Sequence, residues 1–256
     1  MGHLALDMSK WGGDLTAQEA ADMWVLGVRT LIFATGPGGY SSAVVSQIDD
    51  AVKVGFVIEV YYFVEWGNNP AVWIDSGATA LGNLKQHVKR VWIDVEDVNN
   101  TPPSTLAARE AYVRQAVERA QLVYGVPVGI YTGGWFWKDP IRGMANSPAF
   151  SSYSLWNSYY DNDSDIDGLP YGGWTAADVA IEQYTGTVIV AGQSVDTNWA
   201  YKPMTNAIEV PPDNMNNFEE LNQAVMQRFD IIQVASGDYL KMVEAWNALK
   251  SLGLLS

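Results

Sequence analysis

The sequence predicts an α/β fold in which parallel strands alternate with helices. Short apolar runs recur along residues 3–132, and segments whose apolar residues have helical spacing separate them. The run at residues 56–64 is apolar almost throughout, which is typical of a parallel strand covered on both faces. Strands that alternate with helices form βαβ units, so a doubly wound sheet and a barrel both fit.

The expected elements alternate in order. Thr16, followed three residues later by Glu19, is a capping-box pattern that indicates the start of the first helix. Strands are expected over residues 3–8, 29–34, 56–64, 90–96 and 126–132. Helices are expected over residues 16–27, 42–54, 71–88 and 106–124. This order favours successive parallel strands with helical crossovers.

The pattern changes after residue 132. Short strand candidates follow with little helix between them, at residues 153–158, 179–185 and 187–191. An α/β barrel can close with such strands. Apolar spacing then indicates two helices near the C-terminus. We therefore expect a main domain over residues 1–205 and a C-terminal helical hairpin or small module over residues 206–256.

Composition excludes several classes of function. The formal net charge of −14 argues against a nucleic-acid partner and against electrostatic binding to an anionic membrane. The chain has no Cys, which excludes thiolate metal sites, and His3 and His87 have no metal-ligand spacing. We expect no metal and no other cofactor, with a metal site on acidic residues as the alternative. No apolar run reaches transmembrane length. Eleven Trp and thirteen Tyr suit a groove that stacks sugar rings.

Asp94 and Glu96 lie two residues apart at the end of the fourth expected strand. Side chains two apart on a strand share a face, so both carboxylates project together. Their repulsion raises the pKa of one of them, and a proton donor beside an ionised partner is what glycosidic bond cleavage needs. A strand end with solvated acids is the plainer interpretation of this pair.

Two further acids follow expected strands. Asp7 ends the first strand, and Asp196 follows the last strand candidate. If the sheet closes into a barrel, the first and last strands become neighbours, and four acids meet at one mouth. Such a mouth suits a carbohydrate-cleaving site or a divalent-metal site. Ordinary loop acids are the alternative for Asp7 and Asp196.

Eight short motifs follow one another between about residues 4 and 201: LALDMSKW, FAT, YYF, WIDVE, GIYTG, LWNSYY, EQYTG and SVDTNW. In this order they resemble the glycoside hydrolase family 25 lysozymes, the muramidases of bacteria, fungi and phages. The resemblance implies an eight-stranded barrel of the (β/α)5(β)3 type. It also implies cleavage of the β-1,4 bond between N-acetylmuramic acid and N-acetylglucosamine in peptidoglycan.

The resemblance also implies roles for named residues. Glu96 matches the catalytic acid, and Asp94 matches the partner that stabilises the developing positive charge or the acetamido group of the substrate. Asp7 and Asp196 match the two flanking acids of the site. The residues that match groove-lining motifs are Tyr61, Tyr62, Tyr131, Trp156 and Gln183. Core packing is the alternative for these five residues.

The chain departs from the family pattern at three positions. Gly36 replaces a Glu, Tyr62 replaces a His, and Glu182 replaces a Trp. These changes bear on the preferred substrate, and they motivate an alternative function, a barrel that binds glycans without cutting them. A chitinase-like hydrolase would need an Asp where Trp92 stands, and a divalent-metal hydrolase could use the same acids.

The N-terminal residues enter a strand without the basic and apolar regions of a signal peptide. Within the family resemblance, this fits a phage endolysin that is made in a host cytoplasm and acts on the cell wall after release.

Overall fold

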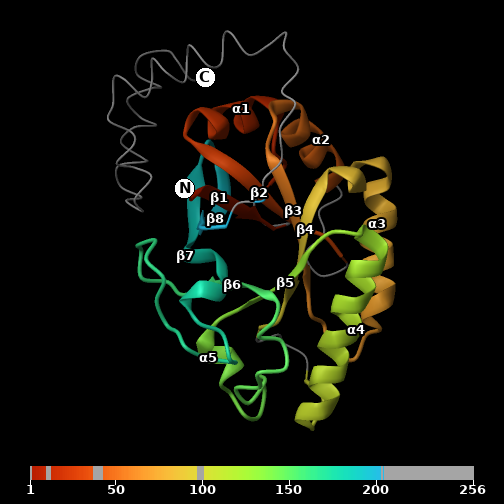
Figure 1. The fold of residues 1–256 in the computed structure, drawn as a ribbon. Coiled ribbons are helices and arrows are strands. Elements are labelled where there is room, and N and C mark those ends of the chain that lie inside the picture. The colour runs from red at the N-terminus through yellow and green to blue at the C-terminus, as the bar shows by residue number, and fades with distance from the viewer. Residues whose placement is uncertain (1, 10–12, 37–42, 97–100, 203, 205–256) are drawn as a thin grey trace.

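The computed structural model describes residues 2–9, 13–36, 43–96, 101–202 and 204. Eight strands form one closed barrel in chain order (Figure 1). They are β1 (His3–Met8), β2 (Val28–Ala34), β3 (Val57–Phe63), β4 (Val88–Asp94), β5 (Val128–Thr132), β6 (Ser154–Ser158), β7 (Val179–Val190) and β8 (Gln193–Ala200). The predicted eight-stranded barrel is confirmed. The predicted C-terminal hairpin lies outside the described residues.

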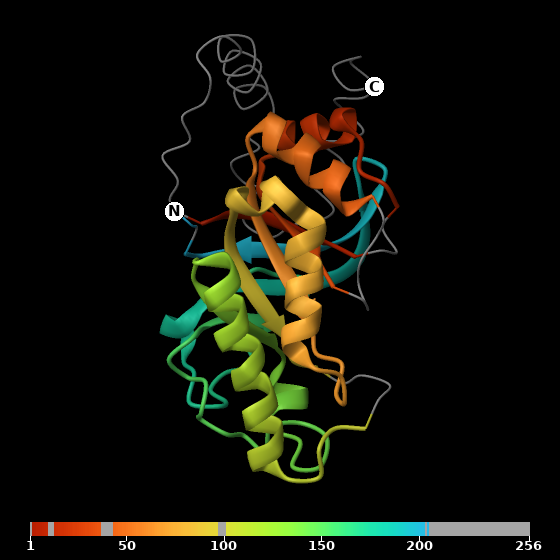
Figure 2. The same ribbon diagram turned by 90° about the vertical axis from the view of Figure 1, so that its right-hand side faces the viewer.

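Helices cover the outside of the first half of the barrel, and Figure 2 shows α3 and α4 side by side against it. The helices are α1 (Ala17–Val25), α2 (Val44–Val54), α3 (Pro70–Leu81), α4 (Leu106–Tyr124) and the short α5 (Gly134–Trp137). The predicted capping box starts α1, because Thr16 and Glu19 satisfy each other's backbone N–H groups. Within the described residues, no helix combines the length and apolar character that a membrane crossing needs.

Two apolar layers hold the barrel together. Alternate strand residues face outward and pack under the helices, as Val91 and Ile93 of β4 do. Their neighbours face inward and fill the barrel with a smaller cluster. That interior cluster consists of Ala5, Ile32, Trp92, Tyr131, Trp156, Ala180, Ile181 and Ala200. The interior is therefore a packed aromatic core below the mouth, rather than a channel.

The last two strands differ from the prediction. Residues 179–185 and 187–191 were expected as separate strands, but residues 179–190 form the single strand β7. Asp196 was expected to follow the last strand, but it lies within β8, which runs antiparallel to both β7 and β1. The register of β7 on β8 shifts between Thr185 and Val188, where Thr187 has a φ of 40°. Because the bulge interrupts the strand pattern in the sequence, the single strand β7 was predicted as two strands.

Gly129 of β5 provides a test of the interior packing. A Cβ at this position would lie 2.2 Å from the Trp92 ring and 2.9 Å from the Ser154 carbonyl oxygen. We expect Gly129→Ala to destabilise the fold by roughly 1–3 kcal/mol, because backbone and a buried ring must move. Gly186→Ala is the control, since its Cβ would meet only ordinary contacts at 3.6 Å or more. Equal urea midpoints for the two variants would contradict this packing.

Candidate active site

Alternation along the strands places acidic residues inside the barrel at the carboxyl ends of the parallel strands. Asp7 lies two residues beyond the inward-facing Ala5, and Asp94 lies two residues beyond Trp92. On β8, Asp196 pairs directly with Asp7 across the β1–β8 seam. Closure of the barrel therefore brings together carboxylates that are 189 residues apart in the chain (196 − 7).

Gln183 of β7 lies at the centre of the mouth and is 2% exposed. Its Nε2 donates to Oδ2 of Asp7 at 2.9 Å and to Oδ2 of Asp196 at 3.2 Å. Its Oε1 accepts hydrogen bonds from the hydroxyl groups of Tyr131, at 2.7 Å, and Tyr160, at 2.8 Å. The two hydroxyls orient the amide so that its N–H groups point at the two carboxylates.

Asn198 is a second hydrogen-bond donor to the Asp7 carboxylate. Its Nδ2 donates to Oδ2 of Asp7 at 2.8 Å, and its Oδ1 accepts from Nε1 of Trp156 at 2.8 Å. The bonds from Asn198 and Gln183 lower the pKa of Asp7, but burial and then the nearby Asp196 carboxylate have the larger effect, so that the pKa of Asp7 is raised. This part of the mouth therefore favours a proton on one of the two acids.

Asp94 and Glu96 form the second pair of acids. Asp94 is 4% exposed, and its Oδ1 has no hydrogen-bond partner among the described residues. Glu96 lies two residues beyond the end of β4 and is half-buried. Burial is the main cause that raises the pKa of Asp94, followed by the carboxylates of Glu96 and Asp7. The four predicted acids thus interact at one mouth, and their mutual repulsion opposes full ionisation.

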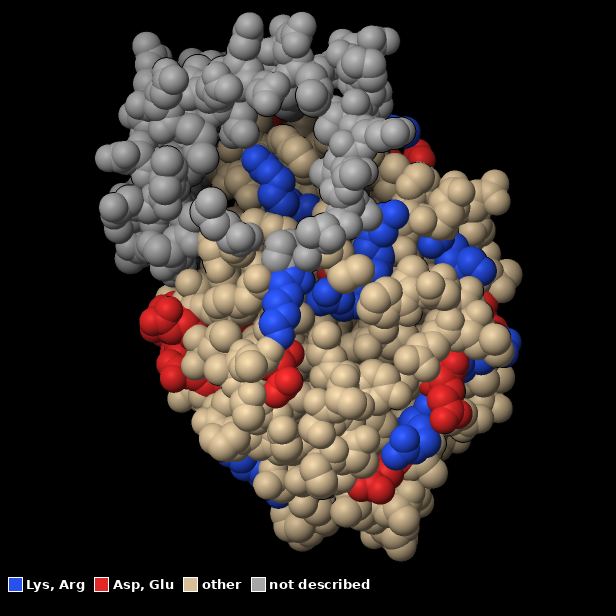
Figure 3. Space-filling view, in the orientation of Figure 1, with Lys and Arg blue, Asp and Glu red and all other residues tan. Residues whose placement is uncertain are grey.

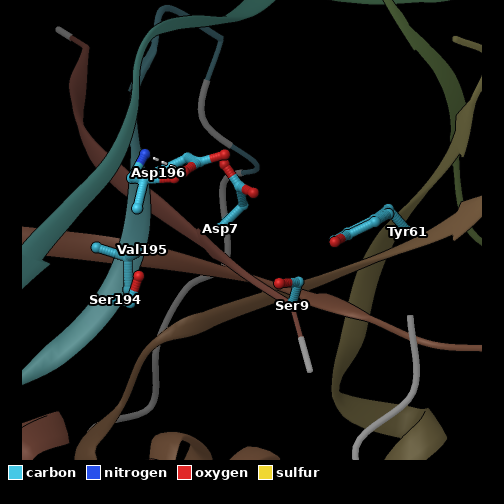
Figure 4. A pocket seen from close by; sticks show the side chains of 7 residues that line it. Asp7, Ser9, Tyr61, Ser194, Val195 and Asp196 are labelled. Carbon is cyan, nitrogen blue, oxygen red and sulfur yellow. Dashed lines mark hydrogen bonds between the residues drawn. The ribbon is translucent and has the colours of Figure 1, made fainter. Parts of the chain in front are cut away.

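A cleft of about 390 Å³ opens beside Asp7 and Asp196 (Figure 4). The two carboxylates point toward one another on one side, and the Tyr61 hydroxyl points in from the other. The remaining lining residues are Ser9, Thr187, Ser194 and Val195. Thr187, at the β7 bulge, forms part of this wall, and its N–H donates to Oδ1 of Asp196. The cleft offers hydroxyl and carboxylate groups, which suit a polyhydroxylated ligand.

Three other predicted groove residues face the barrel interior, but they are largely covered. Tyr131 is 6% exposed, and Trp156 and Gln183 are each 2% exposed. The Tyr131 and Trp156 rings pack edge to face with centroids 4.5 Å apart. Sequence reasoning missed Asn198, although its position two residues after Asp196 placed it on the same strand face. It also missed Tyr160, whose hydrogen bond to Gln183 depends on a loop.

Tyr62 faces away from the mouth, so the prediction that it lines the groove is wrong. It follows Tyr61, and adjacent residues of a strand point to opposite faces. The Tyr62 hydroxyl donates to the Ile74 carbonyl oxygen of α3 at 3.2 Å and lies 2.6 Å from the Tyr124 hydroxyl of α4. Tyr62 therefore belongs to the layer between barrel and helices.

The other two departures from the family pattern are explained by the same outer layer. A Cβ at Gly36 would lie 3.0 Å from the Tyr62 ring, so the larger residue occupies space that the glycine leaves. Glu182 is fully buried between the inward-facing Ile181 and Gln183, and both its oxygens accept from Nδ2 of Asn157 at 3.0 Å. Burial raises the pKa of Glu182 to about 8. None of these three residues lines the cleft.

Acidic side chains also occur on the surface, where they form several separate groups, some of them beside Lys or Arg side chains (Figure 3). In a loop after β6, carboxylate oxygens of Asp161, Asp163 and Asp167 lie within 4.8 Å of one another, and all three residues are exposed. Exposed acidic groups of this kind are common without an ion. Among the described residues, the mouth acids do not form a group of three with such close spacing.

Comparisons with known proteins agree with this geometry. The sequence model of the family "Lysozyme-like protein 1" matches residues 15–184. A relative from Dictyostelium discoideum, "Probable GH family 25 lysozyme 3", is 33% identical over 177 residues, which are 66% of this chain and 35% of that protein. The chain thus spans about a third of this relative's length.

Solved structures share the barrel. A muramidase from Acremonium alcalophilum superposes with a TM-score of 0.62 at 19% identity, covering 86% of this chain and 99% of that one. A family GH25 lysozyme from Aspergillus fumigatus gives a TM-score of 0.63 at 16% identity, covering 80% and 96%. At these identities the likeness establishes the fold, and it confirms the (β/α)5(β)3 architecture that the motif order predicted.

Asp94 allows a test of how ionisation of a buried carboxylate affects the stability of the fold. Its folded-state pKa is raised, so the folded chain holds this proton more tightly than the unfolded chain does. Its contribution to stability is therefore greatest below the unfolded pKa, about 4, and is lost as the pH rises. We expect Asp94→Asn to raise Tm at pH 7, with a difference from wild type that shrinks toward pH 4.

Thermal melts followed by circular dichroism over this pH range measure the effect. Asp14→Asn, at an exposed position, is the matched control and should leave the pH dependence of Tm unchanged. A lower Tm for Asp94→Asn at neutral pH would contradict the view that the ionised carboxylate is costly at this site.

Proposed function

This chain belongs to the lysozyme-like protein 1 family, and on that premise we propose that it is a peptidoglycan hydrolase. The bond cleaved is the β-1,4 linkage between N-acetylmuramic acid and N-acetylglucosamine. The observation that carries the proposal is the convergence of Asp7, Asp94, Glu96 and Asp196 at the mouth of a muramidase-type barrel. Peptidoglycan is then the partner that this mouth accommodates.

Glu96 is the proton donor in this mechanism. It is the more accessible member of the Asp94–Glu96 pair, so its carboxyl group can reach the glycosidic oxygen of a bound strand. Burial by itself favours a proton on Asp94, whereas this mechanism needs the shared proton on Glu96. Because the two acids repel each other, a proton on Glu96 favours an ionised Asp94. As Glu96 gives up its proton to the leaving oxygen, the Asp94 carboxylate stabilises the positive charge that develops on the sugar ring.

Asp7 and Asp196 set the charge around this pair. Both lie on the seam where the barrel closes, and Gln183 holds their carboxylates by hydrogen bonds to one amide nitrogen. Asp7 acts on Asp94 through space, since its negative charge contributes to the raised pKa of Asp94. The flanking acids therefore help the cluster to retain a proton at the pH where the enzyme works.

The alternative of a barrel that binds glycans without cutting them was motivated by the departures from the family pattern. Tyr62 and Glu182 point to the outer side of the sheet, and Gly36 accommodates the Tyr62 ring. These substitutions therefore leave the four acids of the mouth unaltered. The geometry gives no separate support for the non-catalytic alternative.

Glu96→Gln tests the proposed proton donor. The amide keeps the size of the side chain but cannot protonate the leaving oxygen, so we expect roughly a 100-fold or greater loss of activity. Release of reducing ends from purified peptidoglycan measures this activity. The folded state should persist, because Glu96 is only half-buried.

Glu118→Gln, on the exposed face of α4, is the matched control and should cleave like the wild type. Sedimentation with insoluble peptidoglycan shows whether each variant still binds. Full activity in Glu96→Gln would contradict the assignment. Binding by the wild type without release of reducing ends would instead favour the glycan-binding alternative.

A further inference from the structure

Three large aromatic side chains are exposed among the described residues, and all three follow the adjacent strands β5 and β6. They are Trp135, Tyr159 and Tyr160, which are 60%, 43% and 58% exposed. We propose that Tyr160 and Trp135 form a stacking subsite that binds sugar rings of the glycan strand beside the acidic mouth. The inference rests on the proposed function and adds two residues, Tyr160 and Trp135, to which the sequence analysis gave no binding role.

Tyr160 combines an anchored hydroxyl with an exposed ring. Its hydroxyl donates to Oε1 of Gln183, the amide that also binds Asp7 and Asp196. The ring lies beside Gly186, where a Cβ would be 3.6 Å away, and the next residue, Thr187, lines the cleft. The bond to Gln183 therefore holds a flat apolar surface at the border of the cleft.

Trp135 extends the apolar surface over the ends of β5 and β6. Its indole lies over Gly133, because a Cβ there would be 2.4 Å from Nε1 of Trp135 and 2.9 Å from the Ser158 carbonyl oxygen. Ser158 ends β6 and is followed directly by Tyr159 and Tyr160. A side chain at position 133 would displace the indole, which explains the glycine there; at Gly134 a Cβ would instead lie 3.0 Å from the Tyr171 ring.

The chemistry of the surroundings identifies the ligand as carbohydrate. Sugar rings present apolar C–H faces to aromatic rings and hydroxyl groups to polar side chains. Tyr160 and Trp135 supply the aromatic rings, whereas Ser9, Thr187 and Ser194 supply hydroxyl groups in the adjoining cleft. In the described part of the chain, the other exposed large apolar residues are single aliphatic side chains on different elements: Val72, Leu122, Ile141 and Ile189. A glycan strand fits aromatic rings at the ends of adjacent strands, together with a hydroxyl-lined cleft, better than an apolar partner protein does.

The test measures binding of soluble glycan strands, with their peptides removed, to variants made in the inactive Glu96→Gln chain. Titration calorimetry gives Kd without interference from cleavage. We expect Tyr160→Ala and Trp135→Ala each to raise Kd about tenfold, the size of effect that one lost aromatic contact produces. Tyr160→Phe keeps the ring and loses only the hydroxyl that binds Gln183, so its Kd should rise clearly less than that of Tyr160→Ala. Leu122→Ala, on the exposed face of α4, is the control that should bind like the parent.

Kinetics with Glu96 intact provide the second readout. Loss of stacking should raise KM for long strands more than it lowers kcat, and the effect should be smaller on a tetrasaccharide. Equal losses in Tyr160→Phe and Tyr160→Ala would overturn the subsite, because they would assign Tyr160 only the positioning of Gln183. If the wild type cleaves long strands and both alanine variants keep its KM, the subsite is wrong and the proposed function stands. A wild type that neither cleaves nor binds the strands overturns both.

Discussion

The architecture of the mouth depends on one amide, the side chain of Gln183, which lies between the buried carboxylate of Asp7 and the half-buried carboxylate of Asp196. Asp7 and Asp196 come from opposite ends of the barrel sequence and meet only because β8 closes the sheet against β1. Asn198 and Thr187 each donate to one of these acids, but without a donor shared between them the two carboxylates would face each other with their repulsion uncompensated. Gln183 supplies that donor, and Tyr131 and Tyr160 fix its orientation.

The same arrangement explains why the site costs stability. Burial raises the pKa of Asp7, Asp94 and Asp196, so full ionisation at neutral pH is unfavourable. The packed aromatic core below the mouth and the helical layer outside it offset this cost. A cluster of acids that retains a proton lowers the stability of the fold at neutral pH. Retention of a proton is, however, what general acid catalysis requires.

Much of the fold could be predicted from the sequence, because strand periodicity decides which side chains face inward. Period two placed Asp7 and Asp94 on the inner face, and the same rule excludes Tyr62 from the groove. The β7 bulge at Thr187 could not be predicted, because local sequence does not reveal pairing with a distant strand. Tyr160 was also missed as a site residue, since its hydrogen bond depends on how a loop packs on β7.

The proposed function is the cleavage of one particular bond of peptidoglycan at this mouth. Mass analysis of the fragments released from a peptidoglycan of defined structure tests it most directly, because reduction of the products labels the sugar at each new end. We expect fragments whose new reducing end is N-acetylmuramic acid, with the neighbouring strand beginning at N-acetylglucosamine. Fragments that end in N-acetylglucosamine, or cleavage confined to the peptides, would contradict it.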